Sequence, residues 1–350
     1  MYGPVHVVAA GARTPVGLHA PASAAALRAG ISGMGRHPFM VDHLGDPMPG
    51  AIDAVIDPGL FGPDRFLALT ESALREACAP LCEAGFRPRL PLYLALPEPR
   101  PGFGEDDAQA VAAGIVRIER LPANISEVRV STEGHAAGLL VLASALEQIR
   151  SGAIEACLVG GVESYFHPDT MEWLDDNRQL AGADARSAFV PGEGAGFCLL
   201  MGEPARERGG LRARVRVLAA AVARETKLIK TEDVCLGEGL TAAVRAAAAR
   251  LAPPTETVGE VICDLNGERY RGEEWGFACL RLGRYIADPT AYRSPADLWG
   301  DLGAASGPLF VMLACQAAER GYAKASRTML WASSEGGLRA AALLETTAAT

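Results

Sequence analysis

The spacing of hydrophobic residues along the chain predicts a regular alternation of strands and helices. Short apolar runs typical of buried strands occupy residues 5–10, 90–96, 128–131, 157–161, 258–263, 328–332 and 340–344. Helical spacing of apolar residues predicts helices over 22–29, 65–79, 106–118, 136–150, 240–251 and 308–318. The pattern restarts after a change of composition at residues 202–210. We therefore predict an α/β protein with two similar halves, residues 1–202 and 203–350.

Three other segments carry specific expectations. Residues 189–201 are expected to form an antiparallel pair of extended segments around three glycines. The acidic stretch 169–184 is interpreted as a surface loop. A dense basic stretch could dock an acidic partner, but we favour the solvated face of an edge strand. Its members are Arg206, Arg208, Arg212, Arg214 and Arg216.

Composition narrows the classes of function. The 350 residues include 33 basic and 42 acidic side chains, a net charge of −9, which argues against nucleic-acid partners and anionic membrane surfaces. The N-terminus does not have a signal-peptide pattern, and the apolar stretch 302–318 is too short and too mixed to span a membrane. Eight scattered cysteines without a CxxC pair predict reduced thiols in a cytoplasmic protein. No cofactor and no metal are expected.

Four ordered segments resemble the β-ketoacyl synthases of the thiolase superfamily. Two of them are an opening strand and loop at residues 7–17 and 30–33, and a helix and strand at 136–161 that end in a glycine pair. The other two are the string FVPGEGAG at 189–196 and the glycine loops of the C-terminal half. The glycines concerned are Gly160, Gly161, Gly192, Gly194, Gly196, Gly303, Gly336 and Gly337. The resemblance implies a thiolase-like fold of two halves in five αβαβα layers, which usually dimerises along a sheet edge.

The same resemblance reveals missing chemistry. A β-ketoacyl synthase uses a nucleophilic cysteine, two histidines and a lysine. Counting from the glycine turns places His135 at the cysteine, Asn266 at the first histidine and Gly300 at the second. The lysine position falls near Pro295, and no histidine follows His167. In the loop that carries the family's gate and oxyanion amide, the gate position is Ser333 and the oxyanion position holds Glu335.

The residues around His135 allow two interpretations. At a helix N-terminus His135 is expected to stay neutral, unless Glu133 counters the helix dipole. With Glu133, Asp264 and Glu335 it could act as a general base or as part of a metal site, but we favour a polar cluster that fills a vacated pocket. Because Glu133 and Glu335 would face an acyl chain without charge partners, we expect a short or closed cavity there.

These features predict a catalytically degenerate ketosynthase-like protein that works by binding other proteins. It could pair with an active ketosynthase, as chain-length factors do, or resemble the ketosynthase-like components found among type VI secretion accessory genes. The expected assembly is a homodimer, or a heterodimer with a ketosynthase-like or accessory protein, formed at the sheet edge beside residues 128–162. An acyl carrier protein is a further candidate partner. The alternative is a divergent acyltransferase, similar to β-ketoacyl-ACP synthases, that uses a non-standard site around His135.

Overall fold

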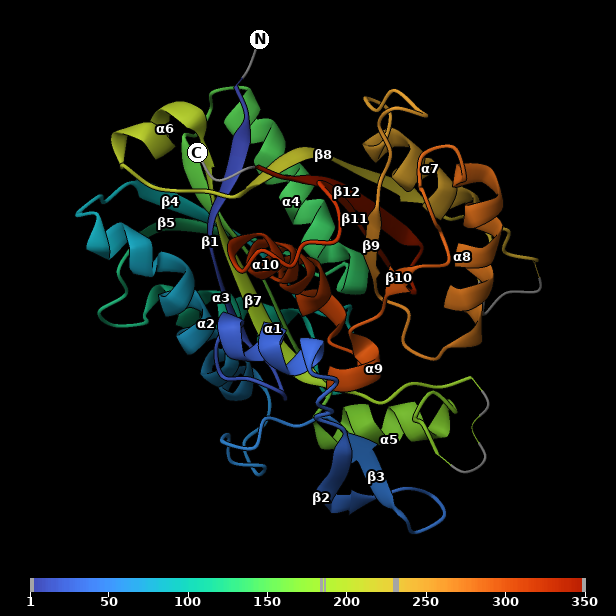
Figure 1. Cartoon of the computed structure of the whole chain (residues 1–350). Coiled ribbons are helices and arrows are strands. Elements are labelled where there is room, and N and C mark those ends of the chain that lie inside the picture. Colours follow the sequence, from blue (N-terminus) through green and yellow to red (C-terminus); the bar gives the residue numbers. More distant parts are fainter. Residues whose placement is uncertain (1–2, 183–184, 186, 229–232, 348–350) are drawn as a thin grey trace.

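The computed structural model describes residues 3–182, 185, 187–228 and 233–347, and a mixed sheet runs through the described molecule (Figure 1). The strand order is β10-β9-β11-β12-β8-β1-β7-β6-β4-β5. The strands are β1 (Val5–Arg13), β4 (Arg89–Ala95), β5 (Asn124–Ser131), β6 (Ala156–Ser164), β7 (Glu193–Gly202), β8 (Val215–Arg224), β9 (Glu260–Cys263), β10 (Tyr292–Arg293), β11 (Arg327–Ser333) and β12 (Leu338–Thr346). A separate hairpin pairs β2 (Gly35–Val41) with β3 (Pro47–Gly50).

The sheet consists of two halves with the same internal order. From the junction outward, one half runs β1-β7-β6-β4-β5 and the other β8-β12-β11-β9-β10. In each half the first two pairings are antiparallel and the outer two are parallel. The halves join where β1 pairs with β8 around Val5 and Val217. The topology is thus duplicated, as the sequence indicated; the boundary at 202/203 falls between β7 and α6 (Glu203–Arg208) and stays a prediction.

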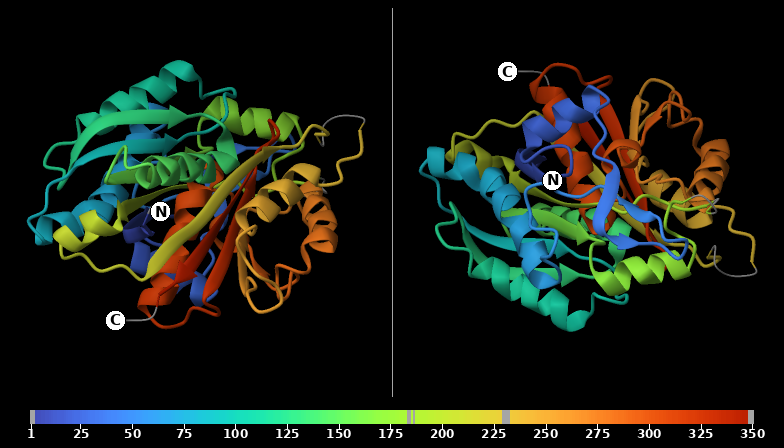
Figure 2. Two further views of the ribbon diagram at one scale, coloured as in Figure 1. Left: turned by 90° about the horizontal axis from the view of Figure 1, so that it is seen from above. Right: turned by 90° about the horizontal axis from the view of Figure 1, so that it is seen from below.

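Helices form layers on both sides of each half-sheet (Figures 1 and 2). The helices α4 (Ala137–Arg150) and α10 (Ser306–Glu319) lie between the halves and contact strands of both. The outer face of the first half is covered by α2 (Pro63–Glu83) and α3 (Glu105–Val116), and that of the second by α7 (Glu238–Ala247) and α8 (Arg269–Leu282). The predicted five-layer thiolase-like architecture is therefore confirmed. The remaining α-helices in the described ranges are α1 (Ala20–Arg28), α5 (Pro168–Asp176) and α9 (Ala296–Trp299).

The position of α10 in the central layer explains why residues 302–318 are apolar and carry no charge. Every residue of α10 from Ser306 to Ala318 is buried, because both half-sheets and α4 surround the helix. A helix enclosed on all sides needs no polar face. In the part of the chain that the structure describes, no helix is long and apolar enough to cross a membrane.

The two central helices meet at a pair of glycines. A Cβ atom on Gly138 would lie 2.5 Å from Cδ of Pro308, and one on Gly307 would lie 2.8 Å from the carbonyl carbon of Gly138. Neither distance leaves room for a methyl group. The close approach brings the first turns of α4 and α10 together, which is where the candidate site begins.

Replacing Gly138 with alanine is expected to lower the free energy of unfolding by about 1–3 kcal/mol, the usual cost of overpacking a tight contact. Gly276 in α8 is the matched control, since a Cβ atom there meets nothing within 4 Å. Gly276→Ala is expected to leave stability unchanged or raise it by up to about 1 kcal/mol. Urea unfolding of both variants measures the difference, and equal stability would contradict the tight crossing.

Three local expectations were wrong. Residues 189–201 do not form a pair of segments: β7 is one strand between β1 and β6, and its glycines allow close packing instead of turns. The acidic stretch begins with helix α5. The basic stretch does not lie on an edge strand, because β8 pairs with β1 and with β12 and only begins at Val215.

Candidate functional site

A cavity of about 610 Å³ opens beside His135. Acidic, aromatic and apolar side chains line it, with Glu98, Glu133, Glu163 and Glu335 among them. The expectation of a short or closed cavity was therefore wrong. One reason is that Glu133 has a charge partner, the Arg224 guanidinium at 3.2 Å. In addition, Oε1 of Glu335 accepts a hydrogen bond of 2.5 Å from the Gln179 side chain.

His135 is held at the junction between β5 and α4. It lies in a one-turn 3₁₀ helix, Gly134–Ala136, that runs directly into α4. Gly134 adopts a left-handed conformation with φ of 64°, which reverses the chain after the strand. The Ala136 amide donates to Oγ of Ser334 at 2.8 Å, and that hydroxyl donates to the Glu133 carbonyl. These contacts fix His135, which is 8% exposed, against the C-terminal half.

The imidazole of His135 meets a buried carboxylate from the C-terminal half. Its Nε2 lies 2.9 Å from both oxygens of Asp301, which is 3% exposed. Asp301 also accepts hydrogen bonds from the Asn266 side-chain amide and from the Tyr165 hydroxyl, and one of 2.7 Å from the Gly303 amide. His135 and Asn266, which stand at the positions of the family's cysteine and first histidine, thus both contact Asp301. Asp301 directly follows Gly300, the position of the family's second histidine.

The expectation that His135 stays neutral did not include the carboxylate of Asp301. Burial by itself would lower the pKa of this imidazole, but the carboxylate of Asp301 outweighs it and raises the pKa above its ordinary value. In return, although burial acts to raise it, the His135 and Arg271 charges hold the pKa of Asp301 well below its usual range. The pair is therefore a buried ion pair over part of the pH range.

Gly300 and Pro295 supply backbone in place of catalytic groups. Gly300 has φ of 75°, and a Cβ atom there would lie 2.8 Å from the Ala51 side chain and 3.0 Å from the Val190 carbonyl. This position cannot take a larger residue without local rearrangement. Pro295 directly precedes α9. The side chain beside His135 is instead the carboxylate of Asp301, which follows Gly300 directly.

Three further ion pairs lie in and beside the cavity. Arg100 donates to Glu163 at 2.6 Å, and its guanidinium lies 4.3 Å from the centre of the Tyr165 ring. Arg271, which is fully buried, donates to Asp264 at 2.7 Å and to Glu268 at 2.9 Å. Asp264 therefore does not face His135 as a bare carboxylate. The site is a network of paired charges.

Sequence reasoning missed Asp301, Arg271 and Arg100. Asp301 could have been found, because it directly follows the position of the absent second histidine. Arg271 lies in α8, a helix that the apolar spacing did not reveal, and its partner Asp264 precedes it by seven positions. No local pattern shows that Arg100 pairs with Glu163 across 63 positions.

The glycine loops position these groups through close contacts. A Cβ atom on Gly161 would lie 2.4 Å from the Ala304 carbonyl, and one on Gly303 would lie 2.0 Å from the Glu163 carboxylate. On Gly336 it would lie 2.6 Å from Oε1 of Glu98, whose carboxylate accepts the Gly336 amide at 2.9 Å. Among Gly160, Gly161, Gly192, Gly194, Gly196, Gly303, Gly336 and Gly337, only Gly303 and Gly337 have left-handed backbones.

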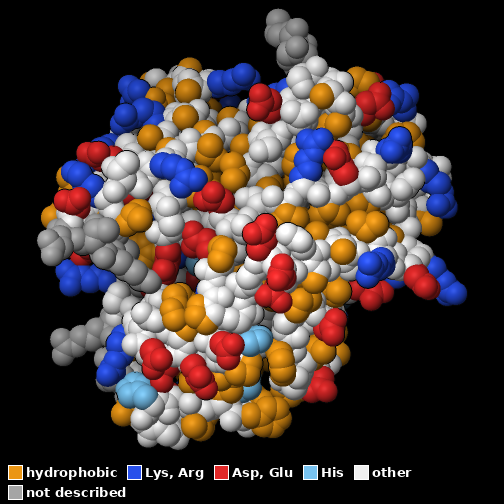
Figure 3. Space-filling view, turned by 180° about the vertical axis from the view of Figure 1, so that it is seen from behind, with side chains coloured by type: hydrophobic (Ala, Val, Ile, Leu, Met, Phe, Trp, Pro, Cys, Tyr) orange, Lys and Arg blue, Asp and Glu red, His pale blue; other side chains and the backbone are white. Residues whose placement is uncertain are grey.

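The cavity offers no nucleophile of the family's kind among the described residues. All eight cysteines are free, and none lines the cavity. Cys78 is buried, and desolvation raises its pKa to about 12. Burial also raises the pKa of Glu98 at the cavity wall, although the Gly336 amide opposes that shift. Acidic side chains gather near the middle of the rear face, above the β2–β3 hairpin (Figure 3). The site can bind and orient a ligand, but a thiolate cannot attack it there.

Comparisons with known proteins agree with this fold. Residues 100–205 match the family described as the β-ketoacyl synthase N-terminal domain. No curated protein sequence matched the chain. The ishigamide ketosynthase/chain length factor structure is similar with a TM-score of 0.82 and 17% identity, covering 99% of this chain and 100% of that one.

Two further solved structures show the same likeness. One is a type II polyketide synthase acyl-carrier protein in complex with its ketosynthase, with a TM-score of 0.76, 14% identity and coverage of 99% and 100%. The other is the ketosynthase from module 6 of the bacillaene synthase of Bacillus subtilis 168, with a TM-score of 0.78, 14% identity and coverage of 99% and 72%. The chain therefore has the thiolase-like fold of ketosynthases and is similar in sequence to their N-terminal domain over residues 100–205.

Proposed function

We propose that this protein is a catalytically degenerate ketosynthase-like subunit that works by pairing with another protein. The observation that carries the proposal is the convergence of His135, Asn266 and Asp301 at the place where the family needs a cysteine and two histidines. A buried carboxylate bonded to an imidazole replaces the thiolate and its acid–base pair. The fold and its glycine contacts are retained around this altered centre.

The electrostatics of the centre oppose condensation. Acyl transfer needs hydrogen-bond donors or positive charge where the oxyanion develops. Here Asp301 is ionised, its pKa lowered by the His135 and Arg271 charges against the opposing effect of burial, and Glu335 stands at the family's oxyanion position. The positive charges of Arg100 and Arg271 are already paired with Glu163 and Asp264. Little positive charge is left for a reacting thioester.

The edge of the first half-sheet is the surface best suited to a partner. Strand β5 pairs on one side with β4, and it ends the sheet. It has eight residues, most of them exposed or half-buried, and Val130 is 40% exposed. An unpaired edge of this length offers backbone donors and acceptors to a second strand. The likeness to a ketosynthase/chain length factor supports a ketosynthase-like partner at this edge, with an acyl carrier protein as a further candidate.

Replacing Val130 with glutamate is expected to disrupt this association, because it buries a carboxylate in the paired edge. Light scattering during gel filtration measures it, on the protein alone and on complexes recovered from its native cell. Val222→Glu is the control, since Val222 is similarly exposed, at 43%, but lies on β8 in the second half. His135→Ala is expected to leave the association intact.

The proposal fails if the protein stays monomeric at high concentration and recovers no partner. It also fails if Val130→Glu associates as strongly as the wild type and the control Val222→Glu do. Genes beside its own distinguish the two forms of the proposal: a complete ketosynthase and carrier protein favour a chain-length-factor-like role, and secretion genes favour an accessory role. Cytoplasmic location stays a prediction under both.

One observation favours a second candidate, a divergent acyltransferase. The His135–Asp301 pair borders an open cavity of about 610 Å³, so a bound acyl thioester could reach the imidazole. In this candidate His135 would act as general base or as nucleophile, with Asp301 holding its ring. The measurement that separates the two candidates closes the Discussion.

A further inference from the structure

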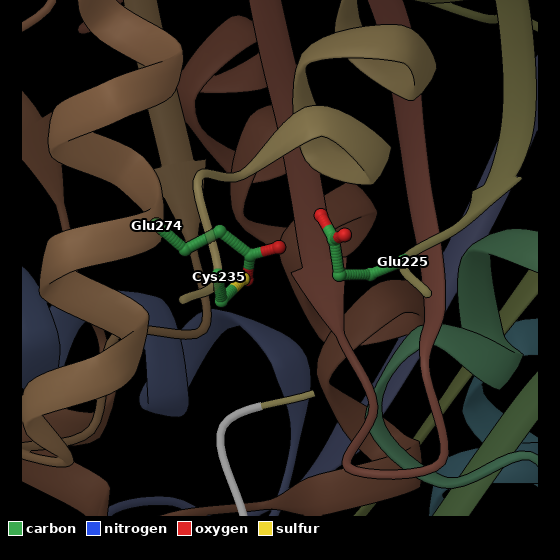
Figure 4. A group of neighbouring side chains, drawn as sticks. All are labelled: Glu225, Cys235 and Glu274. Carbon is green, nitrogen blue, oxygen red and sulfur yellow. The ribbon is translucent and has the colours of Figure 1, made fainter. Parts of the chain in front are cut away.

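A second group of chemically active side chains lies outside the lining of this cavity, next to its Gly336–Gly337 loop, where the Glu225 amide donates to the Gly337 carbonyl at 2.8 Å. Glu225 follows β8, Cys235 lies in the loop before α7, and Glu274 lies on α8 (Figure 4). One ligand atom from each of the three residues lies within 4.8 Å of the other two. Since 10 and 39 positions separate the three residues along the chain, no spacing motif reveals the group.

Glu274 is the member that points to a ligand. Its side chain is 1% exposed, and Oε1 accepts a hydrogen bond of 2.5 Å from Nε of Arg339. Its other oxygen, Oε2, is buried and has no hydrogen bond of ordinary length among the described residues. Burial raises the pKa of this carboxyl, although Arg339 and the nearby Ser333 hydroxyl oppose that shift. In Figure 4 the carboxylate is directed toward Cys235 and Glu225. A buried carboxylate oxygen without a partner carries a desolvation cost that a bound cation would remove.

Glu225 is oriented by the backbone around it. It is 5% exposed, and its oxygens accept hydrogen bonds from the amides of Thr226 and Lys227, and from that of Gly239 at 2.8 Å. Hydrogen bonds of this kind hold a ligating carboxylate in place, and a carboxylate has about four acceptor positions. Glu225 therefore keeps an acceptor position for a metal.

Cys235 gives the group its chemical selectivity and its access. It is half-buried and also lines a surface cavity of about 590 Å³ beside Tyr270 and Phe277. Burial raises the pKa of its thiol, and the nearby Glu274 and Glu225 charges add to that shift. A bound divalent cation would reverse this effect and deprotonate the thiol. The charges would then balance: two carboxylates and a thiolate against one guanidinium and the divalent ion.

We propose that Glu225, Cys235 and Glu274 bind one divalent transition-metal ion of the zinc class. Thiolate and carboxylate ligands together suit Zn²⁺ or Co²⁺ better than Mg²⁺ or Ca²⁺, which take oxygen ligands alone. Ligands of one tetrahedral Zn²⁺ lie about 3.5 Å apart, and the three ligand atoms here all lie within 4.8 Å of one another. Three protein ligands leave a fourth position for water or for an outside ligand that enters through the adjoining cavity.

Metal binding to the purified full chain tests the proposal, after treatment with a chelator. Calorimetric titration with Zn²⁺ is expected to give one ion per chain, and Co²⁺ is expected to show a thiolate charge-transfer band. Cys235→Ser and Glu274→Gln should each weaken binding about tenfold or more. Cys82→Ser, which removes an exposed thiol elsewhere, should bind as the wild type does.

Circular dichroism establishes that each variant is folded, and Cys235→Ser is the mild change on which the test rests. The Co²⁺ band should disappear in Cys235→Ser and persist in Cys82→Ser. The proposal is overturned if the wild type shows no saturable binding, or if Cys235→Ser and Glu274→Gln bind Zn²⁺ as tightly as the wild type. Neither readout depends on the pairing function proposed above.

Discussion

Replacing Asp301 with alanine is expected to lower the free energy of unfolding by about 3–5 kcal/mol, the usual cost of breaking a buried ion pair from one side. The change leaves the buried imidazole of His135 without its partner and removes acceptors from Asn266 and the Gly303 amide. Chemical denaturation measures the difference. Asp297→Ala is the control, because that aspartate lies nearby on α9 and is exposed.

The cost of Asp301→Ala is expected to depend on pH. In the folded protein the pKa of His135 is raised, since the Asp301 charge outweighs burial. The stability that His135 contributes is therefore complete below the pKa of about 6.5 that it has in the unfolded chain, and it is lost as the pH rises through the folded-state pKa. The His135 charge lowers the pKa of Asp301, although burial opposes this shift. The stability that Asp301 contributes is therefore present above the pKa of about 3.9 that it has in the unfolded chain, and it is lost as the pH falls through the folded-state pKa. The penalty should be largest between about pH 4 and 6.5. A constant penalty from pH 5 to 9 would contradict the ion pair.

Replacing Glu193 with alanine is expected to cost a similar amount, about 3–5 kcal/mol, although this residue belongs to the glycine-rich signature and not to the site. Its carboxylate accepts hydrogen bonds from Arg65 at 2.5 and 2.6 Å, from the Asp53 amide and from the Ser164 hydroxyl. Both charged side chains are almost fully buried. Without Glu193, the guanidinium of Arg65 stays buried and uncompensated.

The pair between Glu71 and Arg75 provides the matched control. It lies on the same helix as Arg65, but Glu71 is 54% exposed, so Glu71→Ala should cost about 0–1 kcal/mol. Replacing both partners, Arg65→Met with Glu193→Leu, should recover much of the loss, since apolar side chains carry no desolvation cost. Equal effects of Glu193→Ala and Glu71→Ala would show that the buried pair does not hold the signature loop.

The layered fold could be predicted because its determinants are local. The strand at 157–161 and the helix at 136–150 show their burial through apolar spacing, and both occur in the structure close to the expected bounds. The helix α8 was missed because its buried face includes Arg271 and Glu274, which pair with distant residues and mask the apolar period. The single strand β7 was missed because a glycine that allows close packing looks, in sequence, like a glycine that turns the chain.

The candidate site was predicted in outline only. The spacing of the glycines identified His135, Asn266 and Gly300 as positions of one site. In the structure, the side chains of His135 and Asn266 both contact Asp301. The charge partners could not be predicted, because Arg224 reaches Glu133 across 91 positions and Arg100 reaches Glu163 across 63. Unpaired carboxylates were expected to leave only a short or closed cavity. In the structure Glu133 and Glu163 are paired with arginines, and they line an open cavity.

The most direct test of the central claim is the intact mass of the protein after incubation with acyl and malonyl carrier proteins. We predict an unmodified chain, no condensation product and no decarboxylation above a denatured control, since the thiolate and both histidines are replaced. A complete ketosynthase in parallel shows that the substrates are competent. A stable acyl adduct, or turnover that disappears in His135→Ala, would contradict the account and establish the acyltransferase in its place.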